Sequence, residues 1–177
     1  MQLIFHTPSF SFQLLRILGQ THYRGADIGE CLSTAYRIRE GDIESWYNEW
    51  LRTANRVYEY AENCMDKGHK VSAQDAYLRA TNYYQNGAAF YLDTNPSDPR
   101  IIPTWEKGIE SFRKAIGLFS DKVETIKIHM AKQRFLDIFS MHQRGEDMMI
   151  TIMTIAITTA IIITSQLKNQ LLFLPLA

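Results

Sequence analysis

The feature that most constrains the fold is a long helical period in the residues that follow Gly41. Apolar side chains recur there at steps of three and four residues, which places them on one face of an α-helix. Asp42 can accept hydrogen bonds from the free amides at a helix start, and Gly68 can adopt the left-handed conformation that ends a helix. The spacing therefore predicts a helix of about seven turns between these two residues. The predicted apolar face consists of Ile43, Trp46, Tyr47, Trp50, Leu51, Ala54, Val57, Tyr58 and Ala61.

A second helix is expected after Gly68. Ser72 and Asp75 form an S-x-x-D sequence, in which the side chains can satisfy free amide donors at a helix start. Helical spacing then continues to about Leu92. Small residues on the predicted inner face permit close helix packing, and tyrosine rings can fill the remaining space. The face consists of Ala73, Ala76, Tyr77, Ala80, Tyr83, Tyr84 and Ala88.

The other elements flank these two helices. A turn rich in Pro, Asn, Ser and Asp at 95–99 precedes a third long helix, which we expect to begin near Thr104. A shorter helix is predicted over 26–38, and the alternation of apolar and polar residues at 123–128 predicts a strand. The chain is therefore expected to be mainly α, with a helical domain over 1–120 and a short β-strand over 121–128. The apolar face of the third helix consists of Trp105, Ile109, Phe112, Ala115, Ile116 and Phe119.

The last part of the chain has a different composition. No acidic residue follows Asp147, and Lys168 is the only charged residue after it. Residues 148–167 carry no charge and are long enough to cross a bilayer as a helix, so a membrane segment is one interpretation. Their many Ile and Thr residues fit strands better than helices. The other interpretation is therefore an apolar, aggregation-prone segment without a selected role.

Composition argues against several classes of function. Nineteen basic and nineteen acidic residues give a formal net charge of zero, so no overall field attracts nucleic acid. Cys31 and Cys64 form no C-x-x-C motif, and the five histidines are isolated. We therefore expect no nucleic-acid partner, no metal and no cofactor. The first residues lack the basic and apolar regions of a secretory signal, so the expected location is the cytoplasm, with the membrane as the alternative through 148–167.

The sequence contains no recognisable active site. The motifs G-x-S-x-G, G-x-x-x-x-G-K-[ST], G-x-G-x-x-G and H-E-x-x-H are all absent. The candidate binding residues are Trp46, Trp50, Tyr83 and Tyr84, because tryptophan and tyrosine combine an apolar ring with a polar tip. At helical spacing such residues more often form a core than a ligand pocket. Both interpretations stay open, and no residue is assigned a catalytic role.

Three segments carry a resemblance to a known family. Residues 25–57 read GADIGECLSTAYRIREGDIESWYNEWLRTANRV, residues 68–84 read GHKVSAQDAYLRATNYY, and residues 97–100 read SDPR. Together they resemble the N-terminal helical lid of a family of α/β-hydrolases that includes the 2,6-dihydroxypseudooxynicotine hydrolases and the fungal polyketide-shortening hydrolases, often described as esterase-like or dipeptidyl-aminopeptidase-like. The resemblance covers about residues 10–128. The combination of GDxxSWxxEW with GHxVSAxxAYLRAxNYY is specific.

The resemblance implies a fold and a function. In such enzymes the helical segment covers the mouth of the catalytic domain and shapes its pocket, while the catalytic Ser, Asp and His lie in the domain that follows. It implies that Trp46, Trp50, Tyr83 and Tyr84 lie near the pocket or the domain interface. It also implies a hydrolase domain as a partner in cis and a small-molecule substrate for the intact enzyme. None of the three catalytic residues has a counterpart in this chain.

The resemblance stops at Ile128. Family members continue with a stretch similar to PYGKTTLPGYF, whereas this chain continues HMAKQRFLDIF. If the codons of this stretch are read from the third base of the Ile128 codon, all eleven positions are compatible with the family sequence, and the Met-Ala junction requires Gly. We infer a one-base loss near that codon, with residues 129–177 translated out of frame.

Two hypotheses about function follow. The first is a truncated α/β-hydrolase: a substrate-pocket lid without its catalytic domain, inactive alone, whose parent enzyme is a serine hydrolase of ester or carbon–carbon bonds. The second is a helical interaction module that is anchored by a C-terminal membrane segment at 148–167. The two hypotheses differ in whether the tail has a role.

Overall fold

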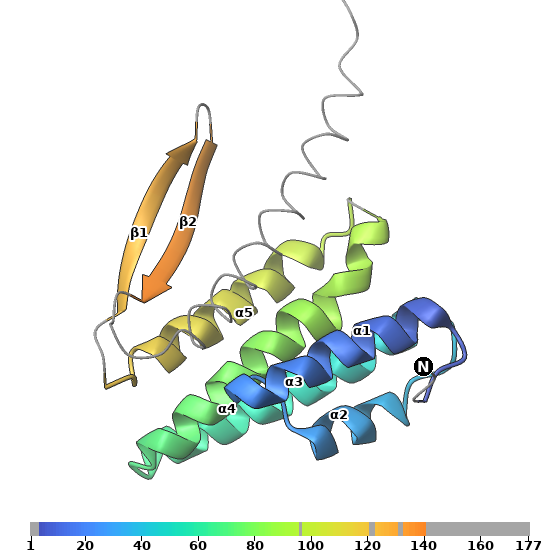
Figure 1. Ribbon diagram of the computed structural model, residues 1–177, viewed down its shortest axis with the longest axis horizontal. Coiled ribbons are helices and arrows are strands. Elements are labelled where there is room, and N and C mark those ends of the chain that lie inside the picture. The colour runs from blue at the N-terminus through green and yellow to red at the C-terminus, as the bar shows by residue number, and fades with distance from the viewer. Residues whose placement is uncertain (1–3, 96, 121–122, 131–132, 141–177) are drawn as a thin grey trace, which may run out of the picture. The chain divides into compact units, whose positions relative to one another are not determined.

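The computed structural model describes residues 4–95, 97–120, 123–130 and 133–140. The chain divides into two compact units, Met1–Phe119 and Ser120–Ala177. Every regular element that is described in the first unit is a helix (Figure 1). The expected mainly α fold is confirmed. The predicted apolar segment 148–167 lies outside the described residues.

The helical unit contains five α-helices and three shorter helical segments among its described residues. Two of the short segments follow α4 directly, so that one continuous stretch changes from α to π to 3₁₀ geometry. The elements, in chain order, are α1 (Pro8–Leu18), the 3₁₀ helix η1 (Gly19–Tyr23), α2 (Ile28–Ala35), α3 (Ile43–Asp66), α4 (Lys70–Asn82), the π-helix η2 (Tyr83–Ala88), the 3₁₀ helix η3 (Ala89–Thr94) and α5 (Ile101–Ile116).

Helix α3 has the two ends that the sequence predicts. At its start, Oδ1 of Asp42 accepts a hydrogen bond of 2.9 Å from the amide of Ser45. At its end, Gly68 adopts a φ of +75°. The amide of His69 then donates to the carbonyl of Cys64 at 2.8 Å, which is the closing hydrogen bond of a Schellman motif. Both ends are therefore set by local hydrogen bonds.

Two helix starts differ from the prediction. Helix α4 begins at Lys70, and no side chain caps it, so the expected cap by Ser72 and Asp75 is wrong. The Schellman turn reverses the chain so tightly that α4 begins two residues before Ser72. Helix α5 begins at Ile101, so Pro103 lies in its first turn. A proline is tolerated there because its missing N–H would have no partner within the helix.

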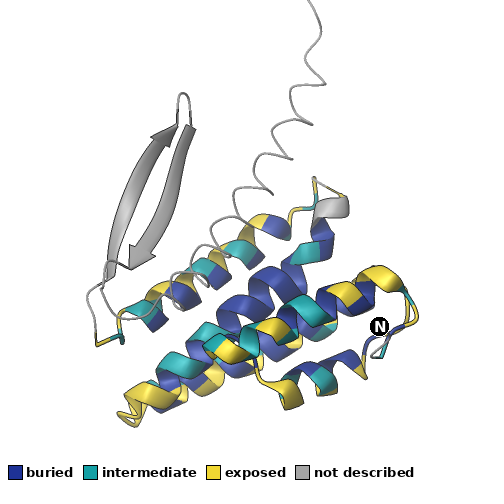
Figure 2. Ribbon diagram, viewed as in Figure 1, coloured by how far each residue is buried: buried dark blue, intermediate teal, exposed yellow. Residues whose placement is uncertain are grey.

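The core of the unit is organised around α4, which packs against both α3 and α5. Ala73, Ala76 and Ala80 are fully buried on α4. Their small side chains let the neighbouring helices approach closely, and the dark blue stretches of Figure 2 show how far burial extends along these helices. The predicted inner face of this segment is confirmed, because all seven of its residues are buried.

The second unit contains a described β-hairpin. Strand β1 (Val123–Met130) pairs antiparallel with β2 (Gln133–Ser140), in a register that places Val123 opposite Ser140 and Met130 opposite Gln133. The strand expected over 123–128 is present and is two residues longer than predicted. The second strand was not predicted from the sequence.

The left-handed turn at Gly68 generates a stability prediction. A Cβ atom at Gly68 would meet nothing within 4 Å, so the cost of Gly68→Ala comes from the positive φ alone. We expect a loss of about 1–2 kcal/mol in the free energy of unfolding. The control is Gly19→Ala, where the space is equally open but φ is −58°. Urea denaturation should show Gly19→Ala near neutral, and equal losses in the two variants would contradict the assignment.

Candidate functional site

The structure brings the four candidate residues into the core of the helical unit. Trp46, Trp50 and Tyr83 have no exposed surface, and Tyr84 is 1% exposed. The Trp50 ring contacts Trp46 at a centroid distance of 6.0 Å and Tyr83 at 5.4 Å. These contacts fit the core interpretation of the pattern. A role at the substrate pocket or the domain interface stays a prediction.

The two tryptophans hold the π-helix η2 in place. Nε1 of Trp46 donates a hydrogen bond of 2.8 Å to the carbonyl of Gly87. A Cβ atom at Gly87 would lie 2.9 Å from the Trp50 ring, so only glycine fits there. From α1, Nε2 of Gln13 donates to the carbonyl of Asn86. The carbonyls of Asn86 and Gly87 therefore accept hydrogen bonds from side chains of α1 and α3. Turns of π-helix often occur at functional sites.

The indole N–H of Trp50 is buried and meets no acceptor among the described residues. Such groups are uncommon in native interiors because burial without a partner costs free energy. The other polar tips of the candidate set are satisfied. The Tyr84 hydroxyl, for example, donates to Oδ1 of Asn55 at 2.7 Å.

Tyr83 lies at the centre of a buried polar network. Its hydroxyl donates to Oε2 of Glu30 at 2.8 Å and accepts from the amide of Asp27 at 2.8 Å. Nε of Arg79 donates to the same Glu30 oxygen at 3.0 Å. Burial, and then the nearby Cys31 and Glu30, raise the pKa of Tyr83, so the phenol stays protonated. Burial also raises the pKa of the Cys31 thiol to about 12, which excludes a reactive thiolate at neutral pH.

Arg100 joins the starts of α3 and α5. Its guanidinium donates two hydrogen bonds to Glu44, at 2.8 and 2.6 Å, and others to Asp98, the shortest at 2.6 Å. It also lies 4.6 Å from the centroid of the Tyr47 ring. Hydrogen bonds from Arg100 lower the pKa of Asp98 to about 2. Arg100 and Asp98 belong to the SDPR segment at 97–100, but the pairing of Arg100 with Glu44 could not be predicted from the sequence because 56 residues separate the two.

A second polar cluster joins the other end of α5 to α3 and α4. Nζ of Lys114 donates to Oε1 of Glu62 at 2.7 Å and to the hydroxyl of Tyr58 at 2.6 Å. The Tyr77 hydroxyl on α4 donates to the same Glu62 oxygen. Burial alone would lower the pKa of Lys114, but the hydrogen bonds with Glu62 and Tyr58 raise it. The ammonium therefore stays charged, and this cluster has the character of a structural clamp.

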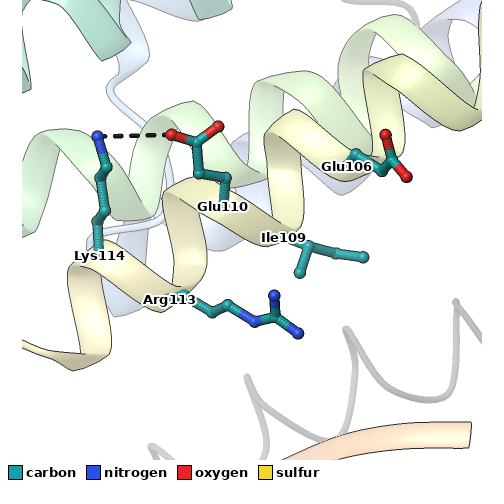
Figure 3. Close-up of a pocket in the computed structure, with 5 residues that line it drawn as sticks. All are labelled: Glu106, Ile109, Glu110, Arg113 and Lys114. Atoms are coloured by element: carbon teal, nitrogen blue, oxygen red, sulfur yellow. Dashed lines mark ion pairs between the residues drawn. The ribbon is translucent and has the colours of Figure 1, made fainter.

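Two of the hollows on the helical unit have walls formed by described residues. The first has a volume of about 590 Å³, and its described walls come from α5 alone. Figure 3 shows Ile109 and Arg113 on one side of this helix, whereas Glu110 and Lys114 lie on another side and form an ion pair of 3.5 Å. The second hollow, of about 510 Å³, follows α3 and is lined by Asn48, Leu51, Arg52, Asn55, Arg56 and Glu59. None of the four candidate residues lines either hollow.

The described residues contain no cluster of three or more His, Cys, Asp or Glu side chains that could hold a metal ion. Within the same residues, no helix combines the length and the apolar character that a membrane crossing requires. Cys31 and Cys64 are both buried and unpaired.

Curated fungal hydrolases match part of this chain. It is 38% identical over 128 residues to the 20-hydroxy-prefusarin hydrolase FUS2 of Gibberella moniliformis, a match that covers 72% of this chain and 30% of that protein. It is 40% identical over 115 residues to the alpha/beta hydrolase psoB of Aspergillus fumigatus, covering 64% of this chain and 26% of that protein. Over this region the chain is related to fungal α/β-hydrolases.

The relation is partial in extent. The chain spans about 30% of the length of the curated relatives that it matches. A third relative, the alpha/beta hydrolase gkaG of Penicillium citrinum, is 37% identical over 124 residues, which are 69% of this chain and 28% of that protein. No family model matches the chain. The chain therefore corresponds to a fragment of these α/β-hydrolase relatives.

Truncation of Trp46 tests how much the aromatic core contributes. The ring contacts Phe5, Phe10 and Tyr91 as well as Trp50, and it donates the bond to Gly87. We expect Trp46→Ala to lower the free energy of unfolding by about 3–5 kcal/mol. The control Tyr36→Ala removes an aromatic side chain that is 76% exposed. Denaturant titration should leave the control nearly unchanged, and an equally mild effect of both variants would show that Trp46 is not a core residue.

The hydrogen bonds between Arg100 and Asp98 predict that the stability of the fold depends on pH. The folded pKa of about 2 lies below the unfolded value of about 3.9, so the clamp stabilises the fold fully above about pH 4. This contribution is lost as the pH falls toward 2. We expect the Tm of Asp98→Asn to decrease less on acidification than the Tm of the parent chain does. The control is Glu106→Gln, because Glu106 makes no ion pair with a described residue. Parallel Tm curves for the parent and Asp98→Asn would rule out the proposed clamp.

Proposed function

We propose that the helical unit is the substrate-pocket lid of a serine α/β-hydrolase, and that the 177-residue chain is inactive by itself. The observation that carries this proposal is the match at 37–40% identity to hydrolases over only 26–30% of their length. A second support is that the sequence contains no G-x-S-x-G nucleophile motif. The parent enzyme would act on an ester bond or on a carbon–carbon bond beside a carbonyl.

The chemistry of such an enzyme lies outside this unit. A serine nucleophile attacks the carbonyl, a histidine acts as the base, and backbone amides stabilise the oxyanion. The lid would contribute a rigid wall that excludes water from this chemistry. The two clamps on α5, through Arg100 and Lys114, support this role because they fix both ends of the helix. The lid's partner would be the hydrolase domain in cis.

We also propose that a one-base loss near the Ile128 codon separates this lid from its catalytic domain. The support is the compatibility of all eleven shifted codons with PYGKTTLPGYF. Residues 129–177 would then be an out-of-frame product, and the Ile and Thr content of 148–167 would have no functional meaning.

An activity assay tests the two proposals together. The 177-residue chain should hydrolyse a p-nitrophenyl ester no faster than buffer and should not be labelled by a fluorophosphonate, a reagent that reacts with activated serines. Insertion of one base within the Ile128 codon should give a longer product that is labelled and hydrolyses the ester. Turnover or labelling of the unmodified chain above background would contradict the assignment as an inactive lid.

Sequencing of the DNA downstream of Ile128 is the matching control. The shifted frame should continue into a strand, a G-x-S-x-G turn and a helix, with an Asp and a His later in the chain. Early stop codons in that frame, together with confirmation of the present frame, would overturn the frameshift and make the tail a genuine part of the protein.

A further inference from the structure

Helix α5 carries an apolar stripe that the helical unit does not use. Ile102, Ile109 and Ile116 recur at steps of seven residues, so they lie on one side of the helix. Ile102 is 68% exposed, and the other two are half-buried. None of the three belongs to the core cluster of the described unit. The side of α5 that packs on α4 and η2 is a different one, which carries Ile101, Thr104, Gly108, Phe112 and Ala115.

Two charged residues complete the stripe. Glu106 and Arg113 are also seven residues apart, and both are exposed. With the three isoleucines they occupy 102, 106, 109, 113 and 116, the spacing of a contact seam along one helix. We call these five residues the outer stripe. It extends over about 21 Å of helix, and Figure 3 shows Ile109 and Arg113 side by side on it.

The charges of the outer stripe lack partners within the helical unit. Among the described residues of this unit, Arg113 is the one arginine for which no ion pair, hydrogen bond or ring contact is present. Glu106 has no ion pair there either. By contrast, Glu110 and Lys114, one residue further along the helix from Ile109 and Arg113, are paired with each other and with α3. The outer stripe therefore presents isoleucines together with one carboxylate and one guanidinium that make no ion pair with a described residue of the helical unit.

The course of the chain indicates what covers this stripe. Only Gly117–Phe119 separate α5 from the end of the helical unit. Three to four residues span at most about 14 Å, so a domain that follows must begin beside the end of α5. The relatives have about 70% of their length outside the matched region. Exposed isoleucines that alternate with charged side chains are compatible with a surface that another domain covers.

We propose that the outer stripe of α5 is the surface on which the hydrolase domain packs in the intact enzyme. This inference rests on the proposed lid function and adds the face that the lid uses. Ile102, Ile109 and Ile116 supply the apolar contact, while Glu106 and Arg113 pair with charges of opposite sign on the hydrolase domain. The occupant is the domain that continues the same chain, not a second copy of the lid.

A matched pair of substitutions tests the proposal. Ile102 and Val71 are both β-branched, both the second residue of their α-helix and both 68% exposed. Ile102→Glu and Val71→Glu are made in the 177-residue chain and in a full-length chimera, in which residues 1–119 replace the matched region of the FUS2 hydrolase. In the 177-residue chain both should leave the Tm unchanged. In the chimera Ile102→Glu should lower the Tm by several degrees and reduce activity, whereas Val71→Glu should change neither.

The outcomes separate this inference from the proposed function. A folded chimera without hydrolase activity would count against the lid function. An active chimera that is equally insensitive to both substitutions would overturn the docking surface alone. If the chimera does not fold, hydroxyl-radical footprinting of intact FUS2 decides: the region matching α5 should be labelled severalfold less than the α5 of the 177-residue chain, and equal labelling refutes the proposal. A dimer of the 177-residue chain that Ile102→Glu dissociates would show that a second copy is the occupant.

Discussion

The contact between two tryptophan rings and a short π-helix is the constraint around which the helical unit is built. Trp50 lies against Gly87 so closely that no side chain fits between them, and Trp46 donates a hydrogen bond to the same glycine's carbonyl. The segment η2 also accepts a hydrogen bond from Gln13 of α1 and packs against α5. These six residues therefore contact helices from both ends of the unit. The positions of α1 and α5 thus both depend on how η2 is held.

Polar clamps act at the margin of this core. Arg100 fixes the start of α5 to α3 through Glu44, and Lys114 fixes its other end through Glu62. Exposed ion pairs contribute little individually because water and salt screen them. Their role here is geometric: they hold α5 in one orientation relative to α3 and α4. Under the proposed lid function this rigidity would matter, because the shape of a pocket wall is set by the helices that form it.

Local sequence patterns were sufficient to predict the longest helix, α3, but they did not predict the contacts between helices. The start and the end of α3 were predicted because Asp42 and Gly68 act through neighbouring residues. The start of α4 was missed because a tight turn took precedence over a plausible cap. The π-helix was not predicted, since Gly87 is required by a ring that lies far away in sequence.

The candidate site shows the same division. The aromatic pattern left open whether Trp46, Trp50, Tyr83 and Tyr84 form a core or a pocket wall, and the structure shows that all four are buried. Their burial depends on α1, α2 and α5 together, which no single helical period describes. The Arg100 clamp was invisible for a related reason: its main partner, Glu44, is 56 residues away. The sequence showed which residues could form aromatic or ionic contacts, but the partner of each residue became known only from the fold.

The long separations around η2 have a consequence for the order of biosynthesis. Gln13 on α1 finds its acceptor 73 residues later, and Trp46 finds its acceptor 41 residues later. A chain that emerges from the ribosome from its N-terminus therefore exposes α1 and the tryptophans of α3 before their partner segment exists. The antiparallel pair of α3 and α4 can form from near neighbours, but the contacts of α1 with η2 can form only after residue 86 has been made. Over that interval Gln13 and Trp46 lack the carbonyl acceptors that η2 supplies in the folded unit.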